Sequence, residues 1–326
     1  MINGFVDLQI NGYMGVDFSS NKLDRESCIT AFQGIIDSGT LLFLPTIITS
    51  NLNIYDKNIQ IISDLISTEP FKKHIPGIHL EGPFFSRCDA LGAHNPDFTH
   101  TVSIKVLDKF VDLSNGKIKL LTLGADVEGV DDLIKYAVNL GIKVSLGHHV
   151  ALADQVTQAA DAGATAFTHL GNGLPALINR HDNPLLGGLA EDRLKAMIIT
   201  DGHHLPIHLI KLIIKVKGLN NIIIVSDAAP LAGMPPGKYE TLGNKVILTD
   251  KGRLYSPDKG CLIGSSAMMI DCINYLYANK ILSYEELIQV GYSNPLDYID
   301  YKIEELPSEK LISFDKENGF KKMGCQ

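Results

Sequence analysis

The chain has 326 residues, enough to bury a large core, and α/β barrels of this length commonly form one unit. Its 29 lysines and arginines against 37 aspartates and glutamates give a formal net charge of -8. No long basic run could follow a phosphate backbone, so we expect no nucleic-acid partner. No apolar segment approaches the roughly 18 residues that a membrane-spanning helix needs, so we expect no membrane partner either.

The five cysteines are widely scattered and form no C-x-x-C pair, which argues against a zinc or redox motif built on thiols. The first stretch, MINGFVDLQI, carries Asp7 and shows no charged leader before an apolar segment. Together these features predict reduced thiols and a cytoplasmic protein.

Short β-branched runs alternate with amphipathic stretches of about a dozen residues, a pattern typical of βα units around a parallel sheet. The predicted strands are 5–10, 40–45, 75–80, 117–123, 142–147, 164–168, 195–200 and 221–226. The predicted helices between them are 24–38, 53–67, 101–113, 129–140, 151–162, 185–193 and 205–217. Eight such strands predict a closed α/β barrel, a (β/α)8 TIM-like fold.

The segment after the eighth strand is rich in turn formers and alternating residues, which predicts a β-hairpin insertion at about 238–257. Helices at 264–278 and 283–291 would then close the barrel. From Pro307 onward the chain is polar, with one strand-like piece, KLISF. We therefore expect a barrel over residues 1–305 and a C-terminal tail over 306–326.

In an α/β barrel the active site lies where the strands reach their C-terminal ends. Polar residues of metal-ligand and acid–base type follow most of the predicted strands: Gln9 and Asn11, Glu81, His148 and His149, His169, Asp201, His203 and His204, and Asp227. Singly, each has an ordinary alternative, because a strand-terminal carboxylate is often solvated or caps a turn, and a histidine is often only hydrogen-bonded. Together, on separate strands, they favour one metal site.

Two neutral imidazoles and one carboxylate are the ligand set typical of catalytic zinc, and they leave a position open for water. Such an ion lowers the pKa of water from about 15.7 to near 7. A carboxylate on the eighth strand, Asp227, could accept the remaining proton. Glu81 closes an apolar strand, so a cation is the partner we expect for it.

At this point the motifs resemble those of the amidohydrolase superfamily and, within it, the N-acetylglucosamine-6-phosphate deacetylase family. HLEGPF followed closely by GAHN is the most specific combination. The matching stretches run in the family's order: DLQINGYMGVDF (7–18), HLEGPF (79–84), GAHN (92–95), SLGHH (145–149), THLGN (168–172), DGHH (201–204), VSDAAPLAG (225–233) and GSSAMM (264–269).

The resemblance implies a metal-dependent amidohydrolase that converts N-acetylglucosamine 6-phosphate to glucosamine 6-phosphate and acetate. It implies that Glu81, His148 and His169 bind one divalent ion per chain, which we expect to be zinc, with iron, cobalt, manganese or nickel as alternatives. Asp227 would be the general acid/base, taking a proton from the attacking water and giving it to the leaving amine. His94 would polarise the acetyl carbonyl together with the ion.

The same resemblance implies which residues hold the amino sugar phosphate. Side chains of Asn172, Arg180 and His204 would do so, helped by the main chain at Ala93, Gly173 and the turn of Leu262, Ile263 and Gly264. In this family the counterpart of Arg180 can come from a second subunit, which implies a homodimer.

The sequence also departs from the family pattern. Many superfamily members carry H-x-H after strand one and bind two metals, whereas Gln9 and Asn11 are neutral amides and would be vestigial second-metal positions. His149 rivals His148 as the ligand. Gly171 and Gly173-Leu174 replace more common residues beside the sugar pocket. The small β-sandwich domain of relatives should be reduced or absent, with the tail over 306–326 as its remnant.

Two alternative functions remain beside this one. The chain could be an amidohydrolase of another N-acyl or cyclic amide, which failure to cleave acetylated hexosamines would indicate. It could also be a sugar-binding relative that has lost catalysis, although Asp227 and all three expected ligands are present.

Overall fold

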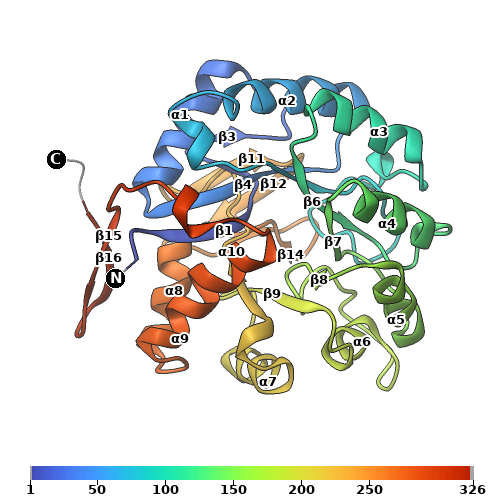
Figure 1. The fold of residues 1–326 in the computed structure, drawn as a ribbon. Helices are drawn as coiled ribbons and strands as arrows, with labels where there is room; N and C mark the ends of the chain where they lie inside the picture. Colours follow the sequence, from blue (N-terminus) through green and yellow to red (C-terminus); the bar gives the residue numbers. More distant parts are fainter. Residues whose placement is uncertain (1, 324–326) are drawn as a thin grey trace.

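A computed structural model describes residues 2–323. Within them, eight parallel strands form one sheet that curls into a barrel, surrounded by helices (Figure 1). This confirms the predicted TIM-like barrel. In sheet order the strands are β1 (Phe5–Ile10), β4 (Thr40–Ile48), β5 (Ile78–Glu81), β6 (Ile118–Leu123), β7 (Lys143–Leu146), β8 (Ala166–Phe167), β9 (Lys195–Ile199) and β10 (Ile222–Val225).

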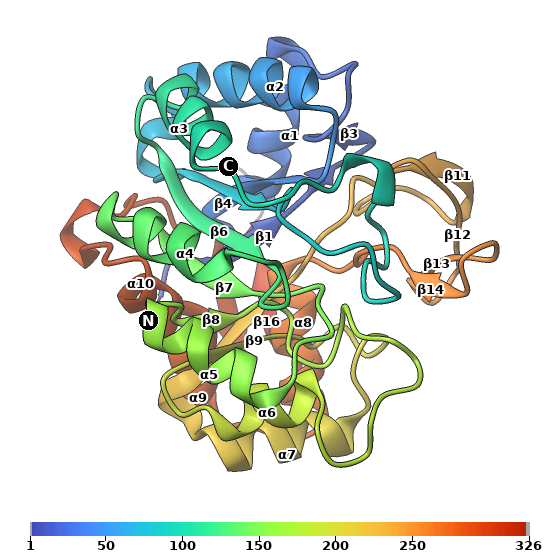
Figure 2. The same ribbon diagram turned by 90° about the vertical axis from the view of Figure 1, so that its right-hand side faces the viewer.

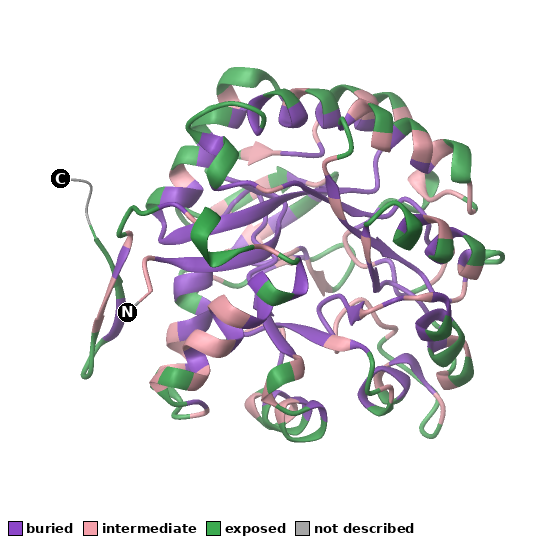
Figure 3. Ribbon diagram, in the orientation of Figure 1, coloured by how far each residue is buried: buried purple, intermediate pink, exposed green. Residues whose placement is uncertain are grey.

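The barrel helices follow the strands along the chain, with buried apolar faces toward the sheet and exposed polar faces outward (Figure 3). They are α1 (Arg25–Asp37), α2 (Leu52–Leu65), α3 (Ile104–Leu113), α4 (Val130–Asn139), α5 (Ala153–Ala162), α6 (Pro184–Ala190), α7 (Ile207–Lys217), α8 (Met269–Ala278) and the short α9 (Tyr284–Ile288). No helix within residues 2–323 combines the length and the apolar character required to cross a bilayer.

The barrel interior is a packed apolar core. Val6 and Leu8 of β1 lie in one buried cluster with Leu42 and Leu44 of β4, as the two-residue period of a strand requires. The same cluster includes Leu296 and Tyr298 of α10 (Asn294–Tyr298). α10 closes the barrel at the end opposite to the strands' C-termini (Figure 2).

Side chains help to close the barrel where the two ends of the sheet, β1 and β10, meet. Ser226 donates to the Asp7 carboxylate from its main-chain nitrogen at 3.2 Å and from Oγ at 2.5 Å. The Asn11 main-chain nitrogen donates to the Ala228 carbonyl at 2.8 Å. Burial raises the pKa of Asp7 to about 7, even though these hydrogen bonds favour its charged form. This seam lies directly below the residues that follow β1 and β10.

The insertion after β10 is larger than the predicted hairpin. It is a four-stranded antiparallel sheet of β11 (Gly237–Thr241), β12 (Asn244–Leu248), β13 (Leu254–Ser256) and β14 (Cys261–Leu262), which we call the insertion sheet. Val246, Leu248 and Leu254 form its own small core with Leu231 and Ile263. The last two strands are too short to show a clear alternation of apolar and polar residues in the sequence. The sheet stands at the end of the barrel opposite α10 (Figure 2).

Both ends of the described chain lie side by side against β1 (Figure 1). The tail forms a hairpin of β15 (Ile312–Asp315) and β16 (Gly319–Lys322). Phe320 packs edge-on against Phe5, with ring centroids 4.9 Å apart, and Leu311 donates to the Asn3 carbonyl at 2.7 Å. A further small pair, β2 (Gly12–Tyr13) and β3 (Val16–Asp17), follows β1.

Candidate active site

Three side chains that could bind a metal converge at the C-terminal end of the barrel. Glu81 is the last residue of β5, and His148 and His169 lie two residues beyond β7 and β8. All three are buried, and one potential ligand atom from each lies within 4.8 Å of the others. We call these residues the ligand triad. The sequence-based ligand prediction thus corresponds to a real cluster in space.

The triad brings hydrogen-bond acceptors together. Glu81 Oε1 is 3.2 Å from His148 Nε2 and 3.0 Å from His169 Nε2, and the two nitrogens are 3.0 Å apart. His148 Nδ1 lies 2.9 Å from the Ala90 carbonyl, which can only accept, so Nδ1 carries the proton of the neutral ring. The lone pair on Nε2 then faces the carboxylate. A divalent cation satisfies such a set of acceptors, so the residues fit the implied metal.

The backbone is strained where these side chains leave the barrel. His148, His169 and Asp227 have φ values of 53°, 35° and 50°, in the left-handed region that non-glycine residues rarely occupy. Such strain persists only where the surrounding structure enforces it, and it is concentrated at functional sites. All three strained positions belong to the predicted site.

Burial and the charges within the cluster shift the pKa values of its members. Burial alone would raise the pKa of Glu81, but the neighbouring imidazoles of His148 and His169 hold it well below its usual value. Burial, and then the charge of Glu81, raise the pKa of Asp227 to about 6. Burial also holds the pKa of His94 well below its usual value. A carboxyl with a pKa close to neutral suits both proton uptake and proton release.

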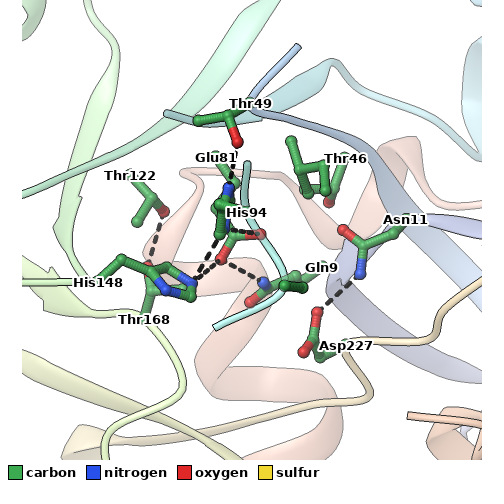
Figure 4. A network of polar contacts seen from close by, with 12 residues as sticks. Gln9, Asn11, Thr46, Thr49, Glu81, His94, Thr122, His148, Thr168 and Asp227 are labelled. Carbon is green, nitrogen blue, oxygen red and sulfur yellow. Dashed lines mark hydrogen bonds and ion pairs between the residues drawn. The ribbon is translucent and has the colours of Figure 1, made fainter. Parts of the chain in front are cut away.

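The two amides at the end of β1 have defined partners (Figure 4). Gln9 Nε2 donates to Glu81 Oε1 at 2.9 Å, and Asn11 Nδ2 donates to Asp227 Oδ1 at 2.7 Å. Gln9 Oε1 and Asn11 Oδ1 are buried and have no hydrogen-bond partner among the described residues. The positions predicted to be vestigial therefore orient one carboxylate of the triad and the carboxylate of Asp227.

His94 stands beside the triad. Its Nε2 lies 3.2 Å from His148 Nε2, and its Nδ1 lies 2.7 Å from Thr49 Oγ1 (Figure 4). His149, the rival ligand, lies elsewhere: its ring packs against Phe167 with centroids 5.1 Å apart, and its Nδ1 accepts from the Ala151 main chain at 3.2 Å. Of the two adjacent histidines, the structure brings only His148 into the triad.

A pocket of about 780 Å³ opens above the triad. Most of the predicted substrate residues line it, namely Ala93, His94, Asn172, Gly173, His204, Leu262 and Gly264, as do Asn11 and Asp227. Two do not. Ile263 is buried in the core of the insertion sheet, and Arg180 is exposed on the loop between β8 and α6. Within one chain, therefore, the structure does not bring Arg180 to the pocket.

Several residues at the site were given no specific role by the sequence-based prediction, although Asp201 was among the polar residues it placed at the strand ends. Asp201 Oδ2 accepts from Ser265 Oγ at 2.9 Å and lies 2.8 Å from His204 Nδ1, so it directs His204 Nε2 toward the pocket. The close spacing of Asp201 and His204 in the sequence could have indicated that these two side chains interact. Thr49, Asn244 and Lys259 were also missed, because their partners lie on loops distant in sequence.

No family model matches the chain. It is 33% identical over 305 residues to the N-acetylglucosamine-6-phosphate deacetylase of Bos taurus, an alignment that covers 90% of this chain and 72% of that protein. It is 29% identical to the N-acetylglucosamine-6-phosphate deacetylase of Lysinibacillus sphaericus, covering 90% and 75% of the two chains. The crystal structure of N-acetylglucosamine-6-phosphate deacetylase from Pasteurella multocida matches with a TM-score of 0.86 at 27% identity, covering 98% of this chain and 83% of that one.

Proposed function

Because the chain belongs to the N-acetylglucosamine-6-phosphate deacetylase family, a family of carbon–nitrogen bond hydrolases, we propose that it removes the acetyl group from N-acetylglucosamine 6-phosphate. The products are glucosamine 6-phosphate and acetate. The observation that carries this proposal is the convergence of the ligand triad, His94 and Asp227 in one buried cluster at the floor of the pocket.

Glu81, His148 and His169 would hold one divalent ion per chain. When bound, the ion polarises the amide carbonyl and lowers the pKa of the attacking water. Two imidazoles and a carboxylate favour zinc, and the same donors also accept iron, cobalt, manganese or nickel. Gln9 and Asn11 are neutral amides, and each donates a hydrogen bond to a carboxylate. This supports a single ion rather than two.

Asp227 is the proposed general acid/base. Asn11 holds its Oδ1, which leaves Oδ2 to take a proton from the attacking water. As the water oxygen bonds to the acetyl carbon and the carbon–nitrogen bond breaks, Asp227 gives that proton to the leaving amine. When Thr49 donates to His94 Nδ1, Nε2 of the neutral ring carries the proton. With the His148 Nε2 lone pair taken up by the ion, this proton would donate to the acetyl oxygen.

The sugar phosphate would lie along the pocket wall formed by Asn172, Gly173 and His204, with main-chain help from Ala93 and the turn ending at Gly264. Asp201 supports this role for His204, because its contact at Nδ1 fixes the orientation of the ring and leaves Nε2 directed toward the pocket.

We further propose that Arg180 acts across a homodimer. Its loop exposes Leu177 at 92% and Ile178 at 40%, and Leu152 and Leu186 nearby are also exposed. The Ala153 main chain donates to Asp182 at 2.9 Å, which holds this loop against the start of α5. An exposed apolar surface of this kind is typical of a protein contact. A second copy covering it would bring Arg180 to the partner's pocket.

Two remaining expectations are also proposals. Cys28, Cys88, Cys261 and Cys272 are free thiols, which supports a reducing, cytoplasmic compartment. The tail hairpin supports the division into a barrel over 1–305 and a small β remnant over 306–326.

Acetate release tests the proposed function. Metal-loaded protein is assayed with N-acetylglucosamine and N-acetylgalactosamine, each with and without the 6-phosphate, and then again after chelation and metal return. We expect the fastest release from N-acetylglucosamine 6-phosphate, lost on chelation and restored by the ion. Release only from another N-acyl or cyclic amide would redirect the substrate assignment. Sugar phosphate binding without acetate release would indicate a non-catalytic relative.

A further inference from the structure

A lysine of the insertion sheet holds the loop that carries His94. Lys259, in the turn between β13 and β14, places Nζ 3.0 Å from the Gly92 carbonyl and 3.3 Å from the carbonyls of both Ala93 and His94. An ammonium group has three N–H donors, and three consecutive carbonyls accept them here. Lys259 therefore has no donor left for a substrate.

A second residue of the same sheet reinforces this contact. Asn244, the first residue of β12, is buried, and its Nδ2 donates to the Ala93 carbonyl at 3.0 Å and to the Leu242 carbonyl at 2.6 Å. Two hydrogen-bonding side chains thus converge on the main chain next to His94. They come from residues about 150 and 165 positions later in the sequence.

The loop needs such support from outside. It lies between β5 and α3, and residues 86–95 contain no helix or strand. The carbonyls of residues 92–94 converge on one point, and this arrangement is unfavourable without a positive charge between them. His94 Nε2 must nevertheless stay 3.2 Å from His148 Nε2 to face the site of reaction.

We propose that the insertion sheet is a clamp that positions His94 for catalysis, with Lys259 as its principal positioning residue and Asn244 as its second. This inference rests on the proposed function, because it assigns His94 the task of polarising the acyl oxygen. It differs from a phosphate-binding role for Lys259, which would require the ammonium to leave the three carbonyls.

Lys259→Met tests the clamp, since it removes the charge and keeps the length of the side chain. Lys245→Met is the matched control, because Lys245 is an exposed lysine on β12 of the same sheet. We expect Lys259→Met to lower kcat by about 10-fold or more while KM changes by less than about 3-fold, as for losing a charged hydrogen bond that acts on the transition state. Bound metal should stay at the wild-type level, and Lys245→Met should behave as wild type.

Chemical rescue separates positive charge from bulk. In Lys259→Ala, methylammonium can occupy the space of the missing ammonium group, so kcat should recover at least partly as its concentration rises. The uncharged additive methanol should not restore activity. A loss confined to KM for the phosphorylated sugar would overturn the clamp in favour of direct phosphate binding. An unchanged kcat in Lys259→Met would overturn it as well.

Hydrogen–deuterium exchange gives a readout that needs no activity. Amides of residues 91–98 should exchange faster in Lys259→Met than in Lys245→Met, whatever substrate the enzyme prefers. Equal exchange in the two variants would refute the clamp even if the deacetylase proposal stands. If exchange rises but wild-type protein releases no acetate, the clamp holds the loop as inferred and the proposed function fails.

Discussion

The two sides of the pocket are built in different ways. Glu81, His148 and His169 lie at or just beyond the ends of barrel strands, and all three are buried. The opposite side consists of the loop after β8, the loop around His94 and the insertion sheet, where exposed residues such as Arg180 alternate with pocket-lining ones. In the proposed function, the strand ends place the metal ligands and Asp227, whereas the loop after β8 and the insertion sheet would contact the sugar phosphate. Mutations on the two sides should therefore change different kinetic parameters.

The largest effect should follow from breaking the ligand triad. His169→Ala removes one of three ligands, so we expect loss of the bound divalent ion and of nearly all acetate release. Elemental analysis of the purified variant measures the first, and an acetate assay the second. His149→Ala is the matched control, because that histidine is equally buried but packs on Phe167, and it should keep its metal. Full metal occupancy in His169→Ala would remove His169 from the site, and two tight ions in the wild type would contradict the proposal of a single ion per chain.

Asp227→Asn should come next. An amide fills the same space and can still contact Asn11, but it cannot accept a proton from water. Positioned proton transfer is worth about 10² to 10⁴ in rate, so kcat should fall by that factor with the metal retained. Steady-state kinetics on metal-assayed protein would decide this, and near wild-type turnover would exclude Asp227 as the general base.

A smaller and more selective effect should appear on the loop side. Arg180→Ala should lower kcat/KM for the 6-phosphate by about 10-fold or more, because a charge-assisted hydrogen bond contributes about 1.5–3 kcal/mol. The unphosphorylated sugar should be almost unaffected. Arg87→Ala is the control, since Arg87 lines the pocket within the same chain. If Arg87→Ala shows the phosphate-selective loss instead, the cation comes from within the chain and not across a dimer.

The smallest effect on turnover should come from substituting Asp7, which lies below the site. Its predicted effect is on stability. The pKa of Asp7 is about 7 in the folded protein against about 3.9 when unfolded, so the folded state holds an extra proton between those values. The free energy of unfolding should therefore fall as pH rises from about 4 to 7, by at most about 1.4 kcal/mol per pH unit from this group. Asp7→Asn should remove that slope, which urea unfolding of both proteins across this pH range would reveal. Parallel stability profiles would show that Asp7 does not hold the extra proton.

Much of the barrel could be predicted because its signals are local. The β-branched run at β10 and the apolar run at β1 gave these strands nearly at their observed bounds. β5 begins at Ile78 rather than residue 75, because Pro76 has no N–H for the ladder and Gly77 follows it. The proposed metal ligands were accessible from sequence for the same reason, since each lies at, or two residues beyond, the end of a recognisable strand.

The sequence could not reveal contacts between loops. Nothing in the neighbourhood of Lys259 indicates that its ammonium lies on the carbonyls of residues 92–94. Likewise, Gln9 and Asn11 could be recognised as poor metal ligands, but not as donors to Glu81 and Asp227. The β13–β14 pair was missed because two or three residues per strand do not establish a period.

The tail hairpin has a consequence for the order in which the protein can fold during synthesis. β1 is the first barrel strand that the ribosome makes, yet Phe5 is covered by Phe320, and the Asn3 carbonyl is satisfied by Leu311. The contact between β1 and β10 also cannot form until Ser226 has been made, because Ser226 donates to Asp7. An apolar strand thus remains without its native cover until residues 311–320 have been made, which favours binding by a chaperone in the interval and slow completion of the native state.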